Sequence, residues 1–174
     1  MKKMRKIFFK PGFTLLELLV VMAILGILST IGIGSFLSSQ VKSRDAKRKS
    51  DLNNIVAALE MYYNDKGEYP GENSFHIAGC PAYPYCEWGS EWSQATPPVV
   101  YMAQLPKDPS SYTYFYDGGG DSYMLFARLE NLKDKDVQEG SPEGGFRDTA
   151  CGPALTPECN YVVASTNATL PALQ

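Results

Sequence analysis

The sequence has little histidine and none of the common motifs of catalysis. It contains a single histidine, His76, in a segment rich in proline and glycine. No Gly-x-Ser-x-Gly, Walker, His-Glu-x-x-His or Cys-x-x-Cys motif is present, so the common signatures of hydrolases, nucleotide-binding enzymes, zinc peptidases and dithiol oxidoreductases are missing. A lone histidine in such a segment is usually a polar residue without a catalytic role. We therefore expect a protein that is not an enzyme.

Basic residues are scarce outside the first twelve positions. The 174-residue chain has 16 Lys and Arg against 19 Asp and Glu, a formal charge of −3. Five of the basic residues lie in residues 1–12, which contain no acidic residue, so the remaining chain carries 16 − 5 = 11 basic against 19 acidic residues. Its charge is therefore −8, which gives no indication of nucleic-acid binding and favours the solubility of an exported part.

The longest apolar run spans residues 13–37, and Glu17 is its only charged residue. A helix rises about 1.5 Å per residue, so a helix of this length can cross a bilayer core of about 30 Å. The basic residues before the run predict a cytoplasmic N-terminus and a single span with the C-terminus outside. No Ala-x-Ala-like site follows the run, which argues against a cleaved secretory signal peptide.

A carboxylate inside this run has two interpretations. An acidic side chain costs about 2.5–3.5 kcal/mol at the middle of a bilayer, so Glu17 is a candidate functional residue. Alternatively, Glu17 lies near the membrane edge, in the first helical turns, where the helix dipole favours an anion.

The segment Lys-Pro-Gly-Phe-Thr-Leu-Leu-Glu at residues 10–17 resembles the prepilin motif of type IV pilins and type II secretion pseudopilins. In that family a membrane peptidase cuts after the glycine on the cytoplasmic face, and the new N-terminal residue is methylated. The resemblance implies cleavage after Gly12, methylation of Phe13, and pairing of the Glu17 carboxylate with an N-terminal amine during assembly. Phe13 and Glu17 are about one helical turn apart, so both charges of the processed chain would share one helix face.

The resemblance also implies partners and a location. The partners are a prepilin peptidase, an inner-membrane assembly platform with its ATPase, membrane lipid before assembly, and further copies of the chain in a helical homopolymer. The chain would lie in the inner membrane with its C-terminus outside, and then in a periplasmic or cell-surface filament. No nucleic acid is expected.

The helical pattern continues over residues 38–66. No proline interrupts residues 13–66, and Gly67 is placed to cap the C-terminus of the helix. One apolar stripe, at the spacing of an amphipathic helix, consists of Leu52, Ile55, Val56, Leu59, Tyr62 and Tyr63. We expect an α+β pilin fold, with a long N-terminal helix whose first half spans the membrane and a small antiparallel β domain packed on its second half. The expected parts are a leader (1–12), a transmembrane or filament-core helix (13–37), an amphipathic half (38–66) and a globular domain (67–174).

A basic cluster follows the apolar run, and it consists of Lys42, Arg44, Lys47, Arg48 and Lys49. We expect a solvated helix face with the local pairs Asp45–Lys49, Lys47–Asp51 and Arg48–Asp51. The alternative is contact with anionic lipid or with an acidic neighbouring subunit.

After Gly67 the composition shifts to glycine, proline, tyrosine and aspartate. Residues 71–98 contain two cysteines, four prolines and both tryptophans, which predicts a long, stapled surface loop. Two aromatic runs, at residues 112–116 and 123–129, flank a glycine-rich turn and predict a hairpin, with Tyr112, Tyr114 and Tyr116 on one face. This order, with a Leu-Pro-x-Asp-Pro segment at residues 105–109, resembles the pseudopilin branch, although Ser110 stands where that branch usually has tryptophan.

Four cysteines in an exported domain indicate disulfides. We favour Cys80–Cys86 and Cys151–Cys159, which close short loops, and leave reduced thiols or another pairing as the alternative. Major pseudopilins also bind calcium in a late loop rich in Asp and Gly, and the corresponding stretch here is 130–148. Its candidate ligands are Asp134, Asp136 and Asp148, but the spacing matches no EF-hand, and a flexible acidic loop without metal is the favoured alternative.

The main hypothesis is a structural subunit of a type IV pilus-like or type II secretion pseudopilus filament. One alternative is a minor or tip pilin that binds DNA or a surface. The other is a single-span anchored exported protein, such as an enzyme or receptor.

Overall fold

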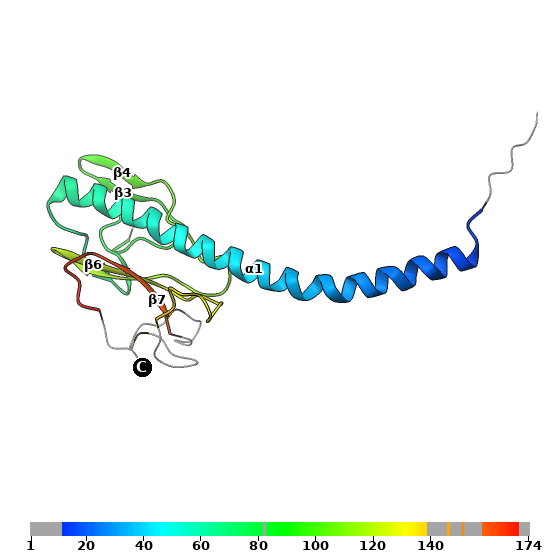
Figure 1. Cartoon of the computed structure of the whole chain (residues 1–174). Coiled ribbons are helices and arrows are strands. Elements are labelled where there is room, and N and C mark those ends of the chain that lie inside the picture. Colours follow the sequence, from blue (N-terminus) through cyan, green and yellow to red (C-terminus); the bar gives the residue numbers. More distant parts are fainter. Residues whose placement is uncertain (1–11, 82, 139–145, 147–150, 152–157, 171–174) are drawn as a thin grey trace, which may run out of the picture. The chain divides into compact units, whose positions relative to one another are not determined.

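The structure, a computed structural model, describes residues 12–81, 83–138, 146, 151 and 158–170 (Figure 1). The described chain divides into two compact units, one up to Gln40 and the other from Val41 onward. Helix α1 (Leu15–Lys66) contributes residues to both units.

Helix α1 begins two residues later than the predicted start at Phe13 and ends where the sequence predicts. It contains 52 residues and ends at Lys66. The next residue, Gly67, has a φ of +77°, and its N–H donates a hydrogen bond to the Tyr63 carbonyl at 2.7 Å. A left-handed glycine directly after the last helical residue is a common helix C-cap, so the cap predicted for Gly67 is confirmed.

The first unit exposes a long series of large apolar side chains. Phe13 and Leu15 are 88% and 89% exposed, and Leu16, Leu19 and Met22 are also exposed. Among the described residues, no single helix is long and apolar enough to cross a membrane. The segments Leu15–Ser29 and Gly34–Lys66 of α1, with a bend between them, are long and apolar enough when taken together, by length and composition only.

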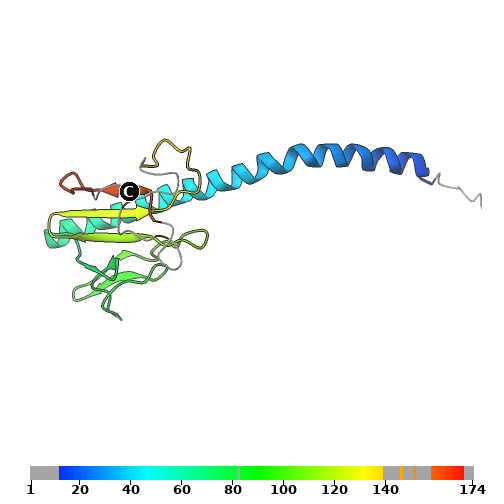
Figure 2. The same ribbon diagram turned by 90° about the horizontal axis from the view of Figure 1, so that it is seen from below.

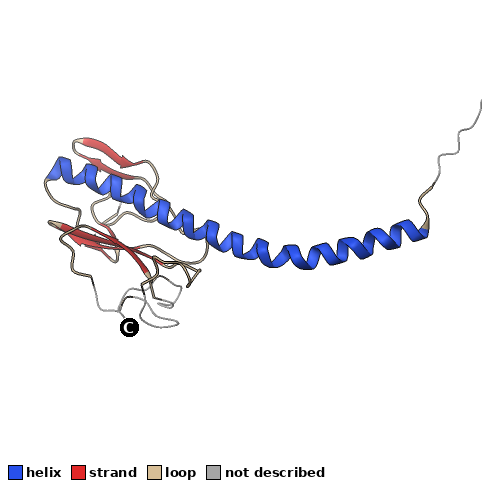
Figure 3. Cartoon of the chain, viewed as in Figure 1, coloured by secondary structure: helices blue, strands red, loops and turns tan. Residues whose placement is uncertain are grey.

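The second unit contains short antiparallel strands in addition to the second half of α1 (Figures 2 and 3). Strand β1 (Glu72–Asn73) pairs with β2 (His76–Ile77), and β3 (Trp92–Ala95) pairs with β4 (Pro98–Met102). The third sheet has the order β5-β6-β7, and its strands are β5 (Phe115–Gly119), β6 (Ser122–Ala127) and β7 (Tyr161–Ala164). All these pairings are antiparallel, so the α+β pilin-like arrangement predicted from the sequence is confirmed.

The predicted tyrosine-rich hairpin is present as β5 and β6, but its first strand begins three residues later than the predicted run 112–116, and β6 covers residues 122–127 instead of 123–129. Phe115 pairs with Phe126 and Tyr116 with Leu125, while residues 117–119 belong to β5 and the turn is reduced to residues 120–121. Glycine in the strand has a packing reason at Gly118, because a side chain there would clash with the Tyr116 ring. The pattern could not show this, since glycine usually marks turns.

The prediction of one long surface loop at residues 71–98 is wrong. This segment holds β1, β2, β3 and the first residue of β4, and it buries Ile77, Trp88 and Trp92. The Trp92 ring stacks on Tyr62 of α1 at 5.7 Å between ring centroids. The prolines and the disulfide suggested a loop, but burial of two large aromatic rings against the helix determines the structure.

The core of the second unit lies between α1 and the strands. Leu52, Ile55 and Leu59 are fully buried, and Val56, Tyr62 and Tyr63 pack against them, so the predicted apolar stripe is confirmed. Tyr114 and Tyr116 belong to this core, whereas Phe115 belongs to a second, smaller cluster with Phe126, Phe146 and the Cys151–Cys159 pair. This alternation places successive side chains of β5 on opposite faces of the sheet.

Candidate functional sites

The Gly12–Phe13 peptide bond lies in the three described residues that precede α1. Both residues are exposed, and their backbone is neither helix nor strand. A peptidase needs an accessible peptide bond outside regular structure, and this bond meets that requirement.

The Glu17 side chain is hydrogen-bonded to Thr14 of its own chain. Its Oε2 atom accepts hydrogen bonds from the Thr14 backbone N–H and from the Thr14 hydroxyl, each at 2.8 Å. The Glu17 N–H in turn donates to the Thr14 hydroxyl oxygen at 3.2 Å. This reciprocal arrangement is a capping box, and it satisfies backbone donors that the first helical turn leaves free. The Thr-x-x-Glu spacing is its sequence signature, and our sequence analysis missed it.

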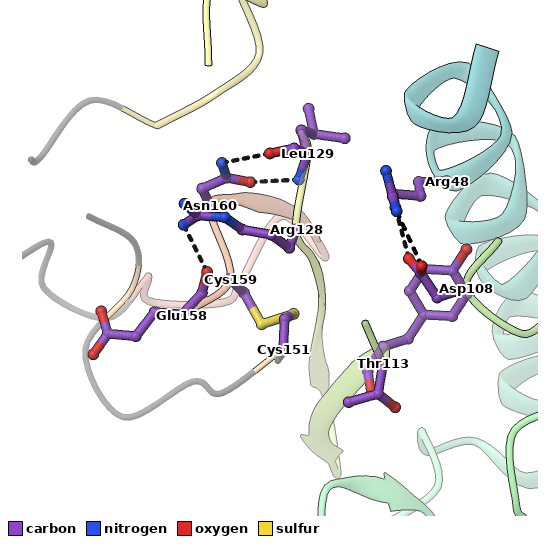
Figure 4. The surroundings of a disulfide bond; sticks show 10 residues. Arg48, Asp108, Thr113, Arg128, Leu129, Cys151, Glu158, Cys159 and Asn160 are labelled. Carbon is purple, nitrogen blue, oxygen red and sulfur yellow. Dashed lines mark hydrogen bonds and ion pairs between the residues drawn. A yellow bond between two sulfur atoms is a disulfide. The ribbon is translucent and has the colours of Figure 1, made fainter. Parts of the chain in front are cut away.

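A buried arginine joins α1 to two distant segments. Arg48 is 0% exposed, and its guanidinium pairs with Asp108 at 2.6 Å, with Asp45 at 2.7 Å and with Glu130 at 2.8 Å (Figure 4 shows the pair with Asp108). It also donates to the hydroxyl of Ser110 at 2.7 Å. Burial alone would lower the pKa of Arg48, but the hydrogen bonds to the carboxylates raise it above its usual value. Arg48 therefore stays charged, and it binds the Leu-Pro-x-Asp-Pro segment to the helix.

The neighbours of Arg48 on the helix bind the chain after β6. Asp45 accepts the backbone N–H groups of Glu130 and Asn131, each at 2.9 Å. Arg44 pairs with Glu130 through Nε, at 2.8 Å, and through Nη2. The hydrogen bond from Arg44, together with that from Arg48, lowers the pKa of Glu130 to about 2 although burial opposes this shift.

The basic cluster is therefore only partly a solvated surface. Of the three local pairs predicted, Lys47–Asp51 is present at 3.3 Å. Arg48 pairs locally with Asp45 and not with Asp51, and it also pairs with Asp108, 60 residues away. Lys49 pairs with Asp134 and Asp136, up to 87 residues away, and Asp51 accepts the Tyr114 hydroxyl at 2.8 Å. One signal could have revealed Arg48, because it lies four residues before Leu52 and so continues the apolar stripe toward the N-terminus.

Lys49 binds the two described members of the predicted calcium site. Its Nζ atom donates to Asp134 at 2.6 Å and to Asp136 at 2.7 Å, and it lies over the Tyr161 ring at 5.7 Å. The hydrogen bond from Lys49 is the main cause that lowers the pKa of Asp134. The third candidate, Asp148, lies outside the described residues. With an ammonium bound to both, Asp134 and Asp136 do not fit a calcium site, and no other cluster among the described residues has three metal-binding side chains together.

The two disulfides are those that the sequence favours. Cys80 is joined to Cys86 and Cys151 to Cys159, and no described cysteine is free. Next to the second bridge, Asn160 is fully buried, and its side chain exchanges two hydrogen bonds with the Leu129 backbone, at 2.7 and 3.1 Å (Figure 4). The bridge thus lies beside the contact that attaches the residue before β7 to the segment that follows β6.

Two protein families match the chain. Residues 10–33 match the prokaryotic N-terminal methylation motif, and residues 35–128, more than half of the chain, match type II secretion system (T2SS), protein G.

The chain belongs to the type II secretion system protein G family.

Individual relatives agree with this family. The type II secretion system core protein G of Vibrio cholerae is 35% identical over 127 residues, which cover 70% of this chain and 77% of that protein. The protein of the same name from Pseudomonas aeruginosa is 32% identical over 138 residues, or 76% of this chain and 94% of that protein. The type IV major pilin PilA of Myxococcus xanthus is 38% identical over 58 residues, or 33% and 26% of the two chains. No solved structure matches the chain.

Membership in the protein G family makes the chain a structural filament subunit and not an enzyme. The relatives do not favour the alternatives of a tip-binding module or an anchored exported protein of another kind. The methylation motif contains Gly12, Phe13 and Glu17, and the protein G match contains Arg48 and Asp108. Glu130 and Asp134 follow the matched range, so the loop that Lys49 binds lies beyond it.

Proposed function

We propose that the chain is processed between Gly12 and Phe13 by a prepilin peptidase, methylated at Phe13, and polymerised into a pilus-like or type II secretion pseudopilus filament. Residues 1–12 are then the leader, residues 13–37 the membrane and filament-core helix, residues 38–66 the amphipathic half, and residues 67–174 the exported domain. An inner-membrane assembly platform and its ATPase drive the polymerisation.

The main support for this proposal is that a single carboxylate, Glu17, lies in an exposed apolar helix. The large side chains around Glu17 are mostly exposed in the isolated chain. Lipid covers them before assembly, and the same helix of other copies covers them in the filament, because water contact would cost about 25 cal/mol per Å². In such surroundings a carboxylate needs a cation.

Cleavage creates that cation. The new ammonium of Phe13 lies four residues from Glu17, close to the cap that Thr14 forms. In the filament, the Glu17 carboxylate pairs with the Phe13 ammonium of a neighbouring copy, and the pairing sets the axial register of the two helices. Within its own chain, Thr14 keeps the carboxylate hydrogen-bonded until the neighbour arrives.

Three substitutions separate the charge of Glu17 from its capping role. Glu17→Gln keeps the capping geometry and removes the charge, and Glu17→Ala removes both. Thr14→Ala removes the capping hydroxyl and keeps the charge. Loss of the cap costs the helix about 0.5–2 kcal/mol, whereas stranding a buried ammonium costs about 3–5 kcal/mol. We therefore expect filaments from Thr14→Ala and few or none from either Glu17 variant.

Shear fractions and electron microscopy measure the filaments, in cells that lack the wild-type copy. Intact mass of the membrane-extracted protein shows whether each variant starts at Phe13 and carries a methyl group. A wild-type chain that keeps Gly12 in cells with an active prepilin peptidase would refute the processing step. Normal filament yield from Glu17→Gln, with loss from Thr14→Ala, would assign Glu17 to capping alone.

A further inference from the structure

A cavity of about 350 Å³ lies in the second unit, next to the Cys80–Cys86 disulfide. The loop that this disulfide closes and the segment around the start of β3 form its walls. The Cys80 Sγ atom lies 3.5 Å from the Glu91 carbonyl oxygen, so this sulfur lies where the loop and the β3 segment meet. The principal lining residues of the cavity are Cys80, Tyr83, Tyr85, Glu87, Glu91 and Ser93.

The four cysteines, all of which the structure describes, differ in exposure. Cys86 is 1% exposed, and Cys151 and Cys159 are 0% exposed. Cys80 is only partly buried, and it is the one member of the four that lines the cavity. Thiol–disulfide exchange needs direct access of a thiolate to one sulfur of a bridge. Within the folded second unit, Cys80 is therefore the cysteine at which that access exists.

The charge of the cavity walls is fixed by the burial of neighbouring residues. Cys86, Trp88 and Trp92 are buried, whereas Glu87 and Glu91, each adjacent to a buried residue, are exposed. Both carboxylates line the cavity, and none of the described residues that line it is basic. The negative charge of these walls disfavours the approach of an anionic thiol.

Backbone hydrogen bonds hold the loop in addition to the disulfide. The Cys86 N–H donates to the Ile77 carbonyl at 2.7 Å, and the Gly79 N–H donates to the Pro84 carbonyl at 3.2 Å. Ile77 is fully buried, so the first of these bonds attaches the loop to the core. The bridge joins cysteines only six residues apart, and disulfides that close short loops add the least stability. Breaking the bridge therefore releases the loop that carries Tyr83, which is 66% exposed, and leaves the core in place.

We propose that Cys80 is a thiol–disulfide exchange site, at which a dithiol opens the Cys80–Cys86 bridge while the rest of the second unit stays folded. A thiolate of the dithiol attacks the Cys80 Sγ atom, the bond between the two cysteine sulfurs breaks, and Cys86 leaves as a thiolate that takes a proton from water. The second thiol of the dithiol, as a thiolate, attacks the reagent's own sulfur in the mixed disulfide and releases Cys80, which is protonated in the same way. The dithiol is oxidised to a disulfide, and its two electrons reduce the bridge.

The Cys80–Cys86 bridge is then a redox-sensitive restraint on its loop, whereas the buried Cys151–Cys159 bridge is a permanent one. Exposed disulfides are the labile and regulatory ones, and buried disulfides react only when the structure around them opens. This exchange does not require polymerisation, so the detergent-extracted monomer is sufficient to test it.

Timed reduction of the full chain in detergent, under native conditions, compares the two bridges. Dithiothreitol is added, free thiols are alkylated with iodoacetamide, and the alkylated peptides are quantified by mass spectrometry. We expect Cys80 and Cys86 to become free at least about tenfold faster than Cys151 and Cys159, while the emission maximum of the buried tryptophans stays at its native wavelength. Equal rates for the two bridges, or unfolding that accompanies the first reduction, would overturn the inference.

A monothiol shows which sulfur is attacked. A short pulse of 2-mercaptoethanol is stopped with iodoacetamide, which alkylates the cysteine that has left and preserves the mixed disulfide on its partner. We expect the mercaptoethanol adduct on Cys80 and the alkyl group on Cys86. The reverse pattern would overturn the assignment of Cys80 as the exchange site.

Thiols of different charge test the approach through the cavity, and cysteamine, 2-mercaptoethanol and 2-mercaptoethanesulfonate form such a series. After correction for the thiolate fraction, we expect the anionic reagent at low salt to react about threefold to tenfold more slowly than the neutral one, and the cationic reagent to react fastest. Glu87→Gln/Glu91→Gln should remove this order. The matched control Glu68→Gln/Asp121→Asn, which neutralises two exposed carboxylates that do not line the cavity, should keep it. Equal rates for the three reagents in the wild type, or an unchanged order in the cavity variant, would overturn the attack from this side.

Discussion

Replacing Arg48 by methionine is the most informative single perturbation of the exported domain. Methionine retains most of the aliphatic length of the side chain and removes the guanidinium, which pairs with Asp45, Asp108 and Glu130. The Asp45 and Asp108 side chains are only 3% and 1% exposed, so water cannot replace the lost cation without a local opening of the structure. The variant therefore leaves buried carboxylates without a counter-charge.

The expected cost follows from the partners that each carboxylate keeps. Glu130 keeps Arg44, and Asp45 keeps two backbone N–H groups at 2.9 Å. Asp108 keeps only the N–H and hydroxyl of Ser110, each at 2.8 Å. Breaking a buried pair typically costs 3–5 kcal/mol, and these remaining bonds place Arg48→Met near the lower end, at about 3–4 kcal/mol. For a domain of this size that loss lowers the melting temperature by about 10–15 °C.

Urea unfolding of the full chain in detergent, followed by tryptophan fluorescence, measures the effect because Trp88 and Trp92 are buried. Arg44→Met is the matched control, since the Arg44 side chain is 32% exposed and contacts Glu130 alone among the carboxylates. The control should cost about 1 kcal/mol or less. If both variants lost the same free energy of unfolding, Arg48 would not be the anchor that its burial indicates.

Three further predictions concern acid, oxidation and calcium. Because the pKa of Glu130 is lowered from 4.5 to about 2, its contribution is fully present above pH 4.5 and is lost as the pH falls toward 2. Glu130→Gln should therefore remove about 2 kcal/mol of acid-dependent unfolding free energy, and an unchanged acid limb would contradict this. Non-reducing peptide mapping should find both short-loop disulfides and no free thiol, with reduction of each costing about 2–3 kcal/mol, whereas cross-paired peptides would refute the pairing. Chelation by EDTA should leave the wild-type unfolding midpoint unchanged, while Lys49→Ala should cost about 1–2 kcal/mol, and a wild-type midpoint that rises with added calcium would show that Lys49 is not the counter-ion.

Local periodicity accounts for the elements that the sequence predicts well. The stripe that begins at Leu52 and the glycine cap at Gly67 depend on contacts within a few residues, and both agree with the structure. The hairpin of β5 and β6 is also a local pairing, with two residues in its turn. Chain proximity likewise favours the pairing of cysteines six and eight residues apart.

The features that sequence reasoning missed depend on long-range contacts or on competing local signals. Strand β7 has four residues, and its identity depends on pairing with β6 more than 30 residues earlier. The long-range partners of Arg48 and Lys49 could not be deduced from spacing, so an i,i+3 or i,i+4 pair was the natural expectation. Thr14 is a different case. The capping-box signature that it forms with Glu17 is visible in the sequence, but Glu17 was interpreted only as a carboxylate in an apolar run.

The distance along the chain between Arg48 and its partners determines the order in which the domain can fold. The arginine is synthesised 60 residues before Asp108 and 82 before Glu130. Lys49 is synthesised 87 residues before Asp136. At about 5–20 residues per second, the nascent helix carries these charges for roughly 3 to 17 seconds before their partners exist. During that interval the helix has no domain to hold it, and the apolar stripe after Arg48 is open to chaperones and to aggregation. The domain can close only after the ribosome has passed residue 130, so folding of the exported part is necessarily a late event.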